Sequence, residues 1–189
     1  WTWLNNLIPL AKPEHKEQFK QDLATCLEQF EPIFLHHYGQ GLCEKMGLPH
    51  FHKDSLDCSF AFLRILQTEQ LDYTQSFIRL QNKEYKALRD DCLDLRQFDA
   101  FLHQYQEIRK TQDTVELDRV MQGANPLYIL RNHMAQKAIE LAERGDFSEV
   151  ERLFKLLNQP YLKQPDLETE QDTAPLPSDV PEVMVSCSS

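Results

Sequence analysis

Glycine is scarce in this sequence, with five residues among 189. Leu, Gln, Glu, Lys and Ala are plentiful instead. Because sheets need more turn residues and more β-branched residues than helices do, this balance favours helix over sheet. We therefore predict an all-α fold: an irregular helical bundle with a C-terminal helical hairpin and an extended acidic tail.

Basic runs are also missing, and the formal net charge is −10. Phosphate backbones and anionic membrane surfaces are bound by clustered Lys and Arg, so neither nucleic acid nor a membrane is an expected partner. The sequence has no stretch of about 18 apolar residues, so no membrane span is predicted. It opens with WTWLNNL, without an initiator Met or a secretory leader, which suggests a chain cut from a longer one.

The five cysteines form no CxxC pair, and their odd number argues against a secreted disulfide framework. A reducing compartment, the cytoplasm, is the expected location. Cys187 lies three residues from the carboxyl end, among serines. The terminal carboxylate would raise the pKa of this thiol, so its expected role is that of a resolving or mixed-disulfide thiol. A chain end without function is the alternative.

Signature motifs of enzymes are absent as well: there is no GxxxxGK, GxGxxG, HRD, DFG or GxSxG. We therefore expect no catalytic and no cofactor-binding residue in this chain. His50, His52, Asp54 and Cys58 are possible metal ligands, but their spacing matches no standard zinc pattern. A polar loop that leads into a helix cap is the favoured interpretation, and no metal site is predicted.

Apolar residues recur with a period near 3.6 through most of the chain, which predicts amphipathic helices. Pro32 is expected to kink the longest of them and Gly47 to end it. Asp54 and Thr74 are the expected N-caps of the next two. The ranges predicted to be helical before residue 125 are 1–10 (as the end of a helix), 14–47, 55–70, 72–80, 95–111 and 115–121.

A helical hairpin is predicted over NPLYILRNHMAQKAIELAERGDFSEVERLFKLLNQPY. Asn125 can cap its first helix, Pro126 suits the first helical position, and Gly145 closes it. Asp146 opens the second helix, with Glu149 as its capping-box partner.

Within the hairpin, Arg131 could bind a carboxylate or a phosphate, or tie the hairpin to a neighbouring helix. The second interpretation is favoured, because structural Arg pairs are common.

The segment from 158 to 189 carries one Lys against six acidic residues, a net charge of −5, and several prolines. Such a composition predicts an extended acidic tail. The predicted organisation is thus a helical domain over residues 1–157, as part of a larger protein, and a tail over 158–189.

The hairpin sequence, the acidic tail and the terminal SCSS together resemble the C-terminal region of the selenoprotein O family. WTWLNNLIPL and EKMGL are similar to the family too, so the resemblance covers the whole chain. Its most specific parts are the NPxYxLRN motif and the final CSS. In some members the position of Cys187 is selenocysteine, and in others it is Cys.

The resemblance implies a protein adenylyltransferase with a kinase-like (pseudokinase) fold. It would use ATP and Mg²⁺ or Mn²⁺ to transfer AMP to Ser, Thr or Tyr hydroxyls of proteins. The family's nucleotide and metal residues would lie upstream of this chain, so the chain alone is expected to be inactive and to pack on the upstream kinase-like lobe. A eukaryotic member would be mitochondrial.

Cys187 is the one position carried over from the family, as the redox-active residue. Two alternatives stay open: a non-enzymatic helical interaction module, and a thiol redox protein that uses Cys187.

Overall fold

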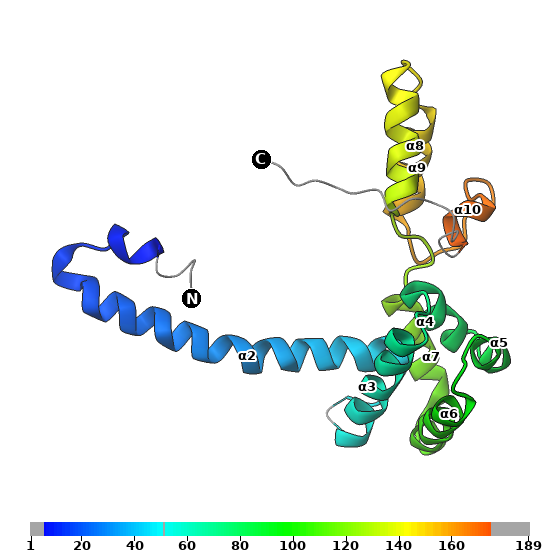
Figure 1. Cartoon of the computed structure of the whole chain (residues 1–189), viewed down its shortest axis with the longest axis horizontal. Coiled ribbons are helices and arrows are strands. Elements are labelled where there is room, and N and C mark those ends of the chain that lie inside the picture. The colour runs from blue at the N-terminus through cyan, green and yellow to red at the C-terminus, as the bar shows by residue number, and fades with distance from the viewer. Residues whose placement is uncertain (1–5, 51, 175–189) are drawn as a thin grey trace. The chain divides into compact units, whose positions relative to one another are not determined.

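The structure is a computed structural model that describes residues 6–50 and 52–174. All regular secondary structure in these residues is helical (Figure 1). The predicted all-α class is therefore confirmed. The chain divides into two compact units, residues 1–41 and residues 42–189.

The first unit consists mainly of one long helix, α2 (Lys16–Met46), which continues into the second unit. Two short 3₁₀ helices precede it, η1 (Ile8–Leu10) and η2 (Pro13–His15). Pro32 lies inside α2, and the predicted range of 14–47 agrees closely with the observed helix. Among the described residues 6–41, Gly39 alone is buried, so this part of the chain has no core of its own.

The second unit has a helical core built by the last turn of α2 and five further helices. Their bounds are α3 (Lys53–Thr68), α4 (Tyr73–Gln81), α5 (Tyr85–Asp90), α6 (Leu95–Lys110) and α7 (Thr114–Ala124). Of these, α5 was not predicted. It is only six residues long and buries one side chain, Leu88, so it offers little apolar period to detect.

An aromatic cluster fills the centre of this core. The ring of Phe62 from α3 lies between those of Phe77 and Phe101, with centroid distances of 5.2 Å and 4.9 Å. Phe101 also stacks on Tyr105, at 5.8 Å, one turn further along α6. Such large buried rings dominate the energetics of a small core. The i, i+4 spacing of Phe101 and Tyr105 belongs to the apolar pattern that predicted α6.

Two predicted helix caps are wrong. His52, not Asp54, precedes the first residue of α3 and makes no side-chain cap hydrogen bond. Asp72, not Thr74, caps α4, because its carboxylate accepts a hydrogen bond of 2.8 Å from the Gln75 N–H. In both cases the helix starts one residue before the expected cap, within the usual uncertainty of helix boundaries.

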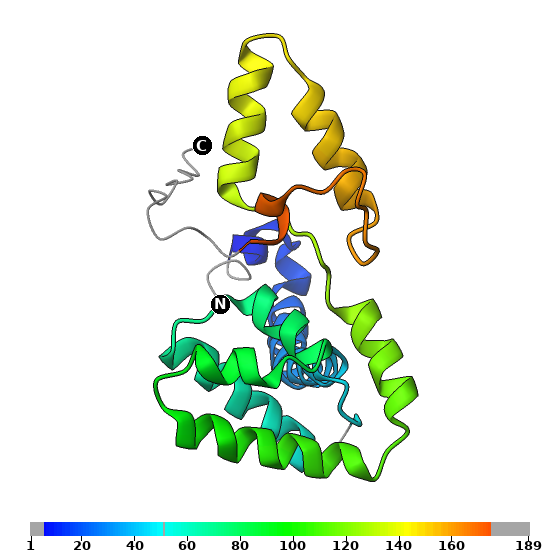
Figure 2. The same cartoon turned by 90° about the vertical axis from the view of Figure 1, so that its right-hand side faces the viewer.

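The hairpin is present, with helices α8 (Asn132–Glu143) and α9 (Ser148–Asn158) side by side (Figure 2). Met134, Ala138 and Leu153 form its small core. Its first helix starts later than predicted, because residues 126–131 are not helical. The N–H groups of Leu127 and Tyr128 both donate to the carbonyl of Pro160, which holds this stretch against the end of α9.

The predicted role of Asn125 as a helix cap is wrong for the same reason. Its side-chain amide donates to the Lys45 carbonyl at 2.8 Å, far along the chain. The predicted capping box of the second helix is also absent. Asp146 accepts a hydrogen bond from the Ser148 N–H, and Glu149 instead pairs with Arg152.

The predicted tail contains one further helix, α10 (Glu170–Thr173), so the predicted extended conformation is wrong for these residues. A capping box forms it: the Thr169 side chain accepts a hydrogen bond from the Asp172 N–H, and the Asp172 carboxylate accepts one from the Thr169 N–H. Such a box can stabilise a single turn that has no apolar period. The boundary predicted between residues 157 and 158 stays a prediction.

Two glycines end helices in the left-handed conformation, at Gly47 (φ +58°) and Gly145 (φ +83°). After α2, the N–H of Leu48 donates to the Cys43 carbonyl and that of Gly47 to Glu44. The turn at Gly145 has the same pattern of hydrogen bonds, that of a Schellman motif. The predicted C-cap at Gly47 and the predicted closure at Gly145 are confirmed.

The two glycines differ in the space around them, which gives a matched test. A Cβ on Gly47 would lie 2.4 Å from Arg109 Nη1 and 2.6 Å from Met121 Sδ, whereas one on Gly145 would meet nothing within 4 Å. We expect Gly145→Ala to cost about 1 kcal/mol, the strain of a left-handed alanine. Gly47→Ala should cost about 3 kcal/mol, because overpacking is added. Urea denaturation measures both; equal losses would show that the contacts at Gly47 do not matter.

Candidate functional site

Arg109 is buried and ties three helices of the second unit together. Its Nη1 donates to the carbonyls of Met46 and Gly47, at 3.3 Å and 3.1 Å, and to the Tyr105 hydroxyl at 3.0 Å. Its Nη2 forms an ion pair with Asp118 of α7. The guanidinium therefore satisfies the last carbonyls of α2, which otherwise have no intrahelical partner.

Asp118 is shared between Arg109 and Lys83, whose Nζ lies 2.8 Å from its carboxylate. Partial burial alone would raise the pKa of Asp118, but the hydrogen bonds from Lys83 and Arg109 lower it below its usual value. The carboxylate is thus charged at neutral pH and compensates for one of the two cations.

A hollow of about 330 Å³ lies beside this network. Its volume is at the lower end of the range for small-molecule sites. The lining contains three cationic side chains, two phenols, an amide and a hydroxyl, and no acidic residue. The residues that line it are Lys83, Tyr85, Tyr105, Gln106, Arg109, Lys110 and Thr114. We call it the cationic hollow.

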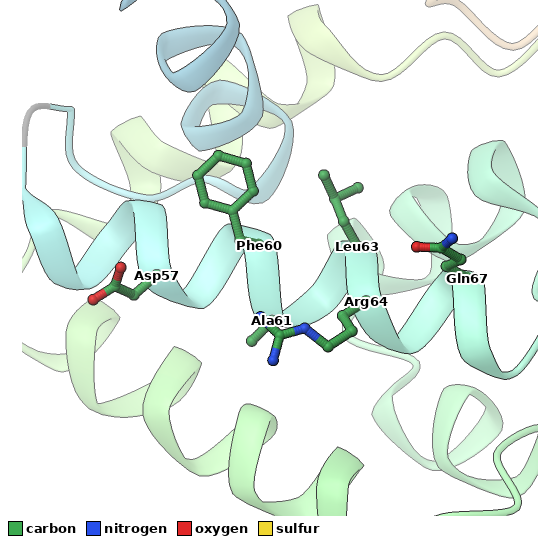
Figure 3. Close-up of a pocket in the computed structure, with 6 residues that line it drawn as sticks. All are labelled: Asp57, Phe60, Ala61, Leu63, Arg64 and Gln67. Carbon is green, nitrogen blue, oxygen red and sulfur yellow. The ribbon is translucent and has the colours of Figure 1, made fainter. Parts of the chain in front are cut away.

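A second hollow of about 650 Å³ lies along α3 and is lined by residues of that helix alone (Figure 3). Phe60 and Leu63 point to the same side in Figure 3, and Arg64 and Asp57 lie nearby. Phe60 is 42% exposed. No second helix contributes a side chain to this hollow, so a small molecule in it would be contacted from one side only, unlike in a concave small-molecule site.

Arg131 ties the hairpin to α4, as the favoured interpretation predicted. Its Nη1 lies 2.8 Å from the carboxylate of Asp72, and both side chains are largely buried. Burial would raise the pKa of Asp72, but the hydrogen bonds from Arg131 and Gln75 lower it. Arg131 is therefore a structural residue here, with its charge compensated by Asp72.

Arg152 holds the start of the predicted tail against α9. Its guanidinium pairs with Glu149 on its own helix and with Asp172 of α10, at 2.9 Å and 2.7 Å. It also donates to the Leu167 carbonyl at 2.8 Å. The pKa of Arg152 is raised by the hydrogen bonds to Glu149 and Asp172. Residues 164–174 are thus part of the folded hairpin.

The possible metal ligands that the sequence placed close together are dispersed in the structure. Cys58 is fully buried in the core, whereas His50 lies 3.9 Å from Glu44 and both His52 and Asp54 line a separate hollow. Among residues 6–50 and 52–174, no group of three or more His, Cys, Asp or Glu side chains could hold a metal ion. These residues therefore do not fit the Mg²⁺ or Mn²⁺ that the resemblance implies.

Cys187, the candidate redox residue, lies outside the described residues. Four other cysteines are free thiols in the described part of the chain, and Cys26 is the exposed one. Burial raises the pKa of Cys58 to about 12 and that of Cys92 to about 11. Such thiols are protonated and poorly nucleophilic at neutral pH.

Comparison with known proteins identifies the family. Residues 2–158 match the family model described as protein adenylyltransferase SelO. The chain belongs to the SelO family. Proteins named protein nucleotidyltransferase YdiU are similar: that of Pectobacterium atrosepticum is 38% identical over 88% of this chain and 35% of its own length. The protein of Pectobacterium carotovorum is 37% identical over 97% of this chain and 39% of its own length. The protein of Pseudomonas entomophila is 35% identical over 90% of this chain and 36% of its own length.

The chain thus spans little more than a third of the length of these SelO relatives. The resemblance predicted from NPxYxLRN and the terminal CSS is confirmed. In the described residues, no helix is both long and apolar enough to cross a bilayer.

Sequence reasoning missed the cationic hollow. Lys83 and Tyr85 come from the stretch around α5, which was not predicted, and Lys110 ends α6. Lys110 follows Tyr85 by 25 residues and Lys83 by 27, so no motif joins the two parts of the lining. The sequence shows only the two short parts of the lining separately: Lys83 and Tyr85 are two residues apart, and Arg109 directly precedes Lys110 at the end of a predicted helix.

The Arg152–Asp172 pair predicts an acid-sensitive hairpin. Burial would raise the pKa of Asp172, but hydrogen bonds from Arg152 and Thr169 lower it below the value of 3.8 expected for an unfolded chain. A folded carboxyl with a lowered pKa stabilises the fold above the unfolded pKa, and this contribution is lost as the pH falls through the folded pKa. Stability should therefore be constant from pH 7 to about 5 and fall below about 4.

Asp172→Asn tests this assignment. It should cost about 3 kcal/mol at pH 7, because it leaves Arg152 without one of its buried partners. The difference in the free energy of unfolding between this variant and the original chain should shrink at pH 3, because Asp172 becomes protonated as the pH falls. Asp57→Asn breaks an ion pair in which both side chains are more than half exposed, and serves as the control. Urea denaturation at pH 7, 5 and 3 gives the values; a loss at pH 7 no larger than that of the control would contradict the role of Asp172.

Proposed function

We propose that this chain is the C-terminal helical part of a protein adenylyltransferase, an enzyme that transfers AMP from ATP to Ser, Thr or Tyr hydroxyls of proteins. The observation that carries the proposal is the match to the SelO family over residues 2–158, by a chain that spans little more than a third of its relatives' length. The remaining two thirds leave room for the catalytic machinery.

In this proposal, ATP and a divalent metal, Mg²⁺ or Mn²⁺, are bound by polypeptide outside the chain. The lack of a metal-binding group in the described residues is compatible with this arrangement. The role of the present helices is then to pack on the kinase-like lobe and stabilise it. The expected location of the enzyme is the cytoplasm.

The exposed apolar side chains of α2 support a packing role. Phe30, Phe34 and Tyr38 stack on one another along one face, with centroid distances of 5.9 Å and 5.6 Å, and Ile33 adjoins them. Phe30 is 64% and Phe34 50% exposed. Isolated exposed apolar residues are common on soluble proteins, but a continuous row of aromatic rings on one helix is typical of an interface. We call these residues the α2 ladder.

The hairpin carries a similar set of side chains. Phe147, which directly precedes α9, and Val150 and Phe154 on α9 follow each other at steps of three and four, and all are exposed. The second candidate function, a helical module that binds a partner protein, rests on the same observation. It differs in requiring no further catalytic polypeptide. A redox role of Cys187 stays a prediction.

The transfer of AMP tests the proposal directly. The chain alone and a longer SelO polypeptide that contains it would be incubated with ATP labelled on its α-phosphate and with Mg²⁺. We expect labelled protein only with the longer polypeptide, and no labelling when EDTA removes the metal. Labelling by the chain alone would refute the assignment of catalysis to other polypeptide, and no labelling by either would refute the transfer activity.

The α2 ladder gives a second test. In the longer polypeptide, Phe34→Asp should lower the free energy of unfolding by about 3 kcal/mol, because it removes a buried ring and buries a charge. In the chain alone the same change should be close to neutral, since Phe34 is exposed there. Gln21→Asp places the same charge on the opposite face of α2 and is the control.

Thermal and urea denaturation of both polypeptides compare the two variants. A loss caused by Phe34→Asp in the chain alone would contradict the exposure of the ladder. A neutral effect in the longer polypeptide would contradict its role in packing.

A further inference from the structure

The cationic hollow concentrates positive charge in an acidic chain. Lys83, Arg109 and Lys110 line it, and the two acidic residues paired with them are Asp118 and Glu107. Three cations against two anions leave one positive charge in excess, whereas the whole chain has a net charge of −10. Positive charge gathered in a concave site attracts anions from solution.

The two lysines are free to move toward a ligand. Lys83 and Lys110 are 56% and 66% exposed, and their ion pairs with Asp118 and Glu107 are at the surface. Surface pairs of this kind contribute little to stability, so a doubly charged anion in the hollow can compete for the ammonium groups. Arg109, in contrast, is held rigidly by the carbonyls at the end of α2.

The neutral side chains of the lining can each donate a hydrogen bond, and the Tyr105 hydroxyl already donates to the Met46 carbonyl. Burial raises the pKa of Tyr85, so its phenol keeps the proton. Within the described part of the chain, the Gln106 amide and the Thr114 hydroxyl have no side-chain hydrogen bond. With an arginine and two lysines in its lining and no acidic residue among the lining residues, the hollow matches the oxygens of a phosphate group better than a cation or an apolar ligand.

The volume sets the size of the ligand. About 330 Å³ corresponds to about eleven water molecules at roughly 30 Å³ each. A single inorganic phosphate would leave most of this space filled with water. A diphosphate, or a phosphate joined to a further group, would occupy more of it and carries more oxygens for the cationic side chains of the lining.

We propose that the cationic hollow is a binding site for a small molecule that carries phosphate groups, with Lys83, Lys110 and Arg109 as its cationic contacts. The site lies within the second unit and is independent of the catalytic function proposed above. Its ligand is either free phosphate or diphosphate, or the phosphate chain of a nucleotide.

Binding of inorganic diphosphate to the 189-residue chain tests the proposal. Isothermal titration calorimetry in low-salt buffer with EDTA excludes binding through a metal. We expect saturable binding with one site, which weakens as salt is added because the attraction is screened. Lys110→Gln and Lys83→Gln should each raise the dissociation constant about threefold to tenfold, as expected for the loss of one charged contact.

Lys86→Gln is the matched control, because Lys86 is an exposed lysine of α5 that does not line the hollow. It removes the same charge from the same unit. Amide NMR spectra of the chain with diphosphate should show shifts around Gln106 and Thr114. Thermal denaturation of all three variants should give the midpoint of the original chain, which separates loss of binding from loss of folding.

Orthophosphate and ADP distinguish the two sources of the phosphate group. Tighter binding of ADP than of diphosphate would identify a nucleotide as the ligand, and equal or weaker binding would identify free diphosphate or phosphate. The proposal is overturned if diphosphate and ADP show no saturable binding up to millimolar concentration. It is also overturned if Lys86→Gln weakens binding as much as Lys110→Gln does.

Discussion

The fold of the second unit depends on how the end of α2 is satisfied. Gly47 turns the backbone into the left-handed region, and Arg109 donates to the last carbonyls from the space that a Cβ would occupy. A buried guanidinium is costly unless its donors are satisfied, and here Asp118, Tyr105 and two carbonyls accept from it. One side chain thereby ties the last turn of α2 to α6 and α7 within the second unit, and it also forms one wall of the cationic hollow.

Two further arginines form ion pairs at the start of the hairpin and on its second helix. Arg131 pairs with Asp72, which also caps α4, and Arg152 pairs with Asp172, which also caps α10. In each case one carboxylate serves both a helix end and a distant arginine. Because the hairpin core consists of a few small and medium-sized side chains, these polar ties matter more here than they would in a larger domain.

The middle of the described chain and its two ends differ in how much apolar surface they bury. The aromatic core around Phe62 and Phe101 is closed, whereas the α2 ladder and the exposed face of α9 present rings to solvent. Rows of exposed apolar side chains of this kind are expected where further polypeptide covers them. The membership of the SelO family and the short span relative to its members agree with that interpretation.

The sequence by itself determined the all-α class, the long helix up to Gly47, the hairpin with its turn at Gly145, and the family. The apolar period, the positions of the glycines and the family motif are properties of short stretches of the chain, so they can be recognised in a single sequence. Tertiary structure decided where some helices start: Asn125 does not cap the hairpin because its amide donates to the distant Lys45 carbonyl, and Asp72, which pairs with Arg131, caps α4. Tertiary structure also decided that residues 164–174 fold onto the hairpin, through the ion pair between Arg152 and Asp172. It also created the cationic hollow, since Lys83 and Lys110 become neighbours only after α5, α6 and α7 have packed around Arg109.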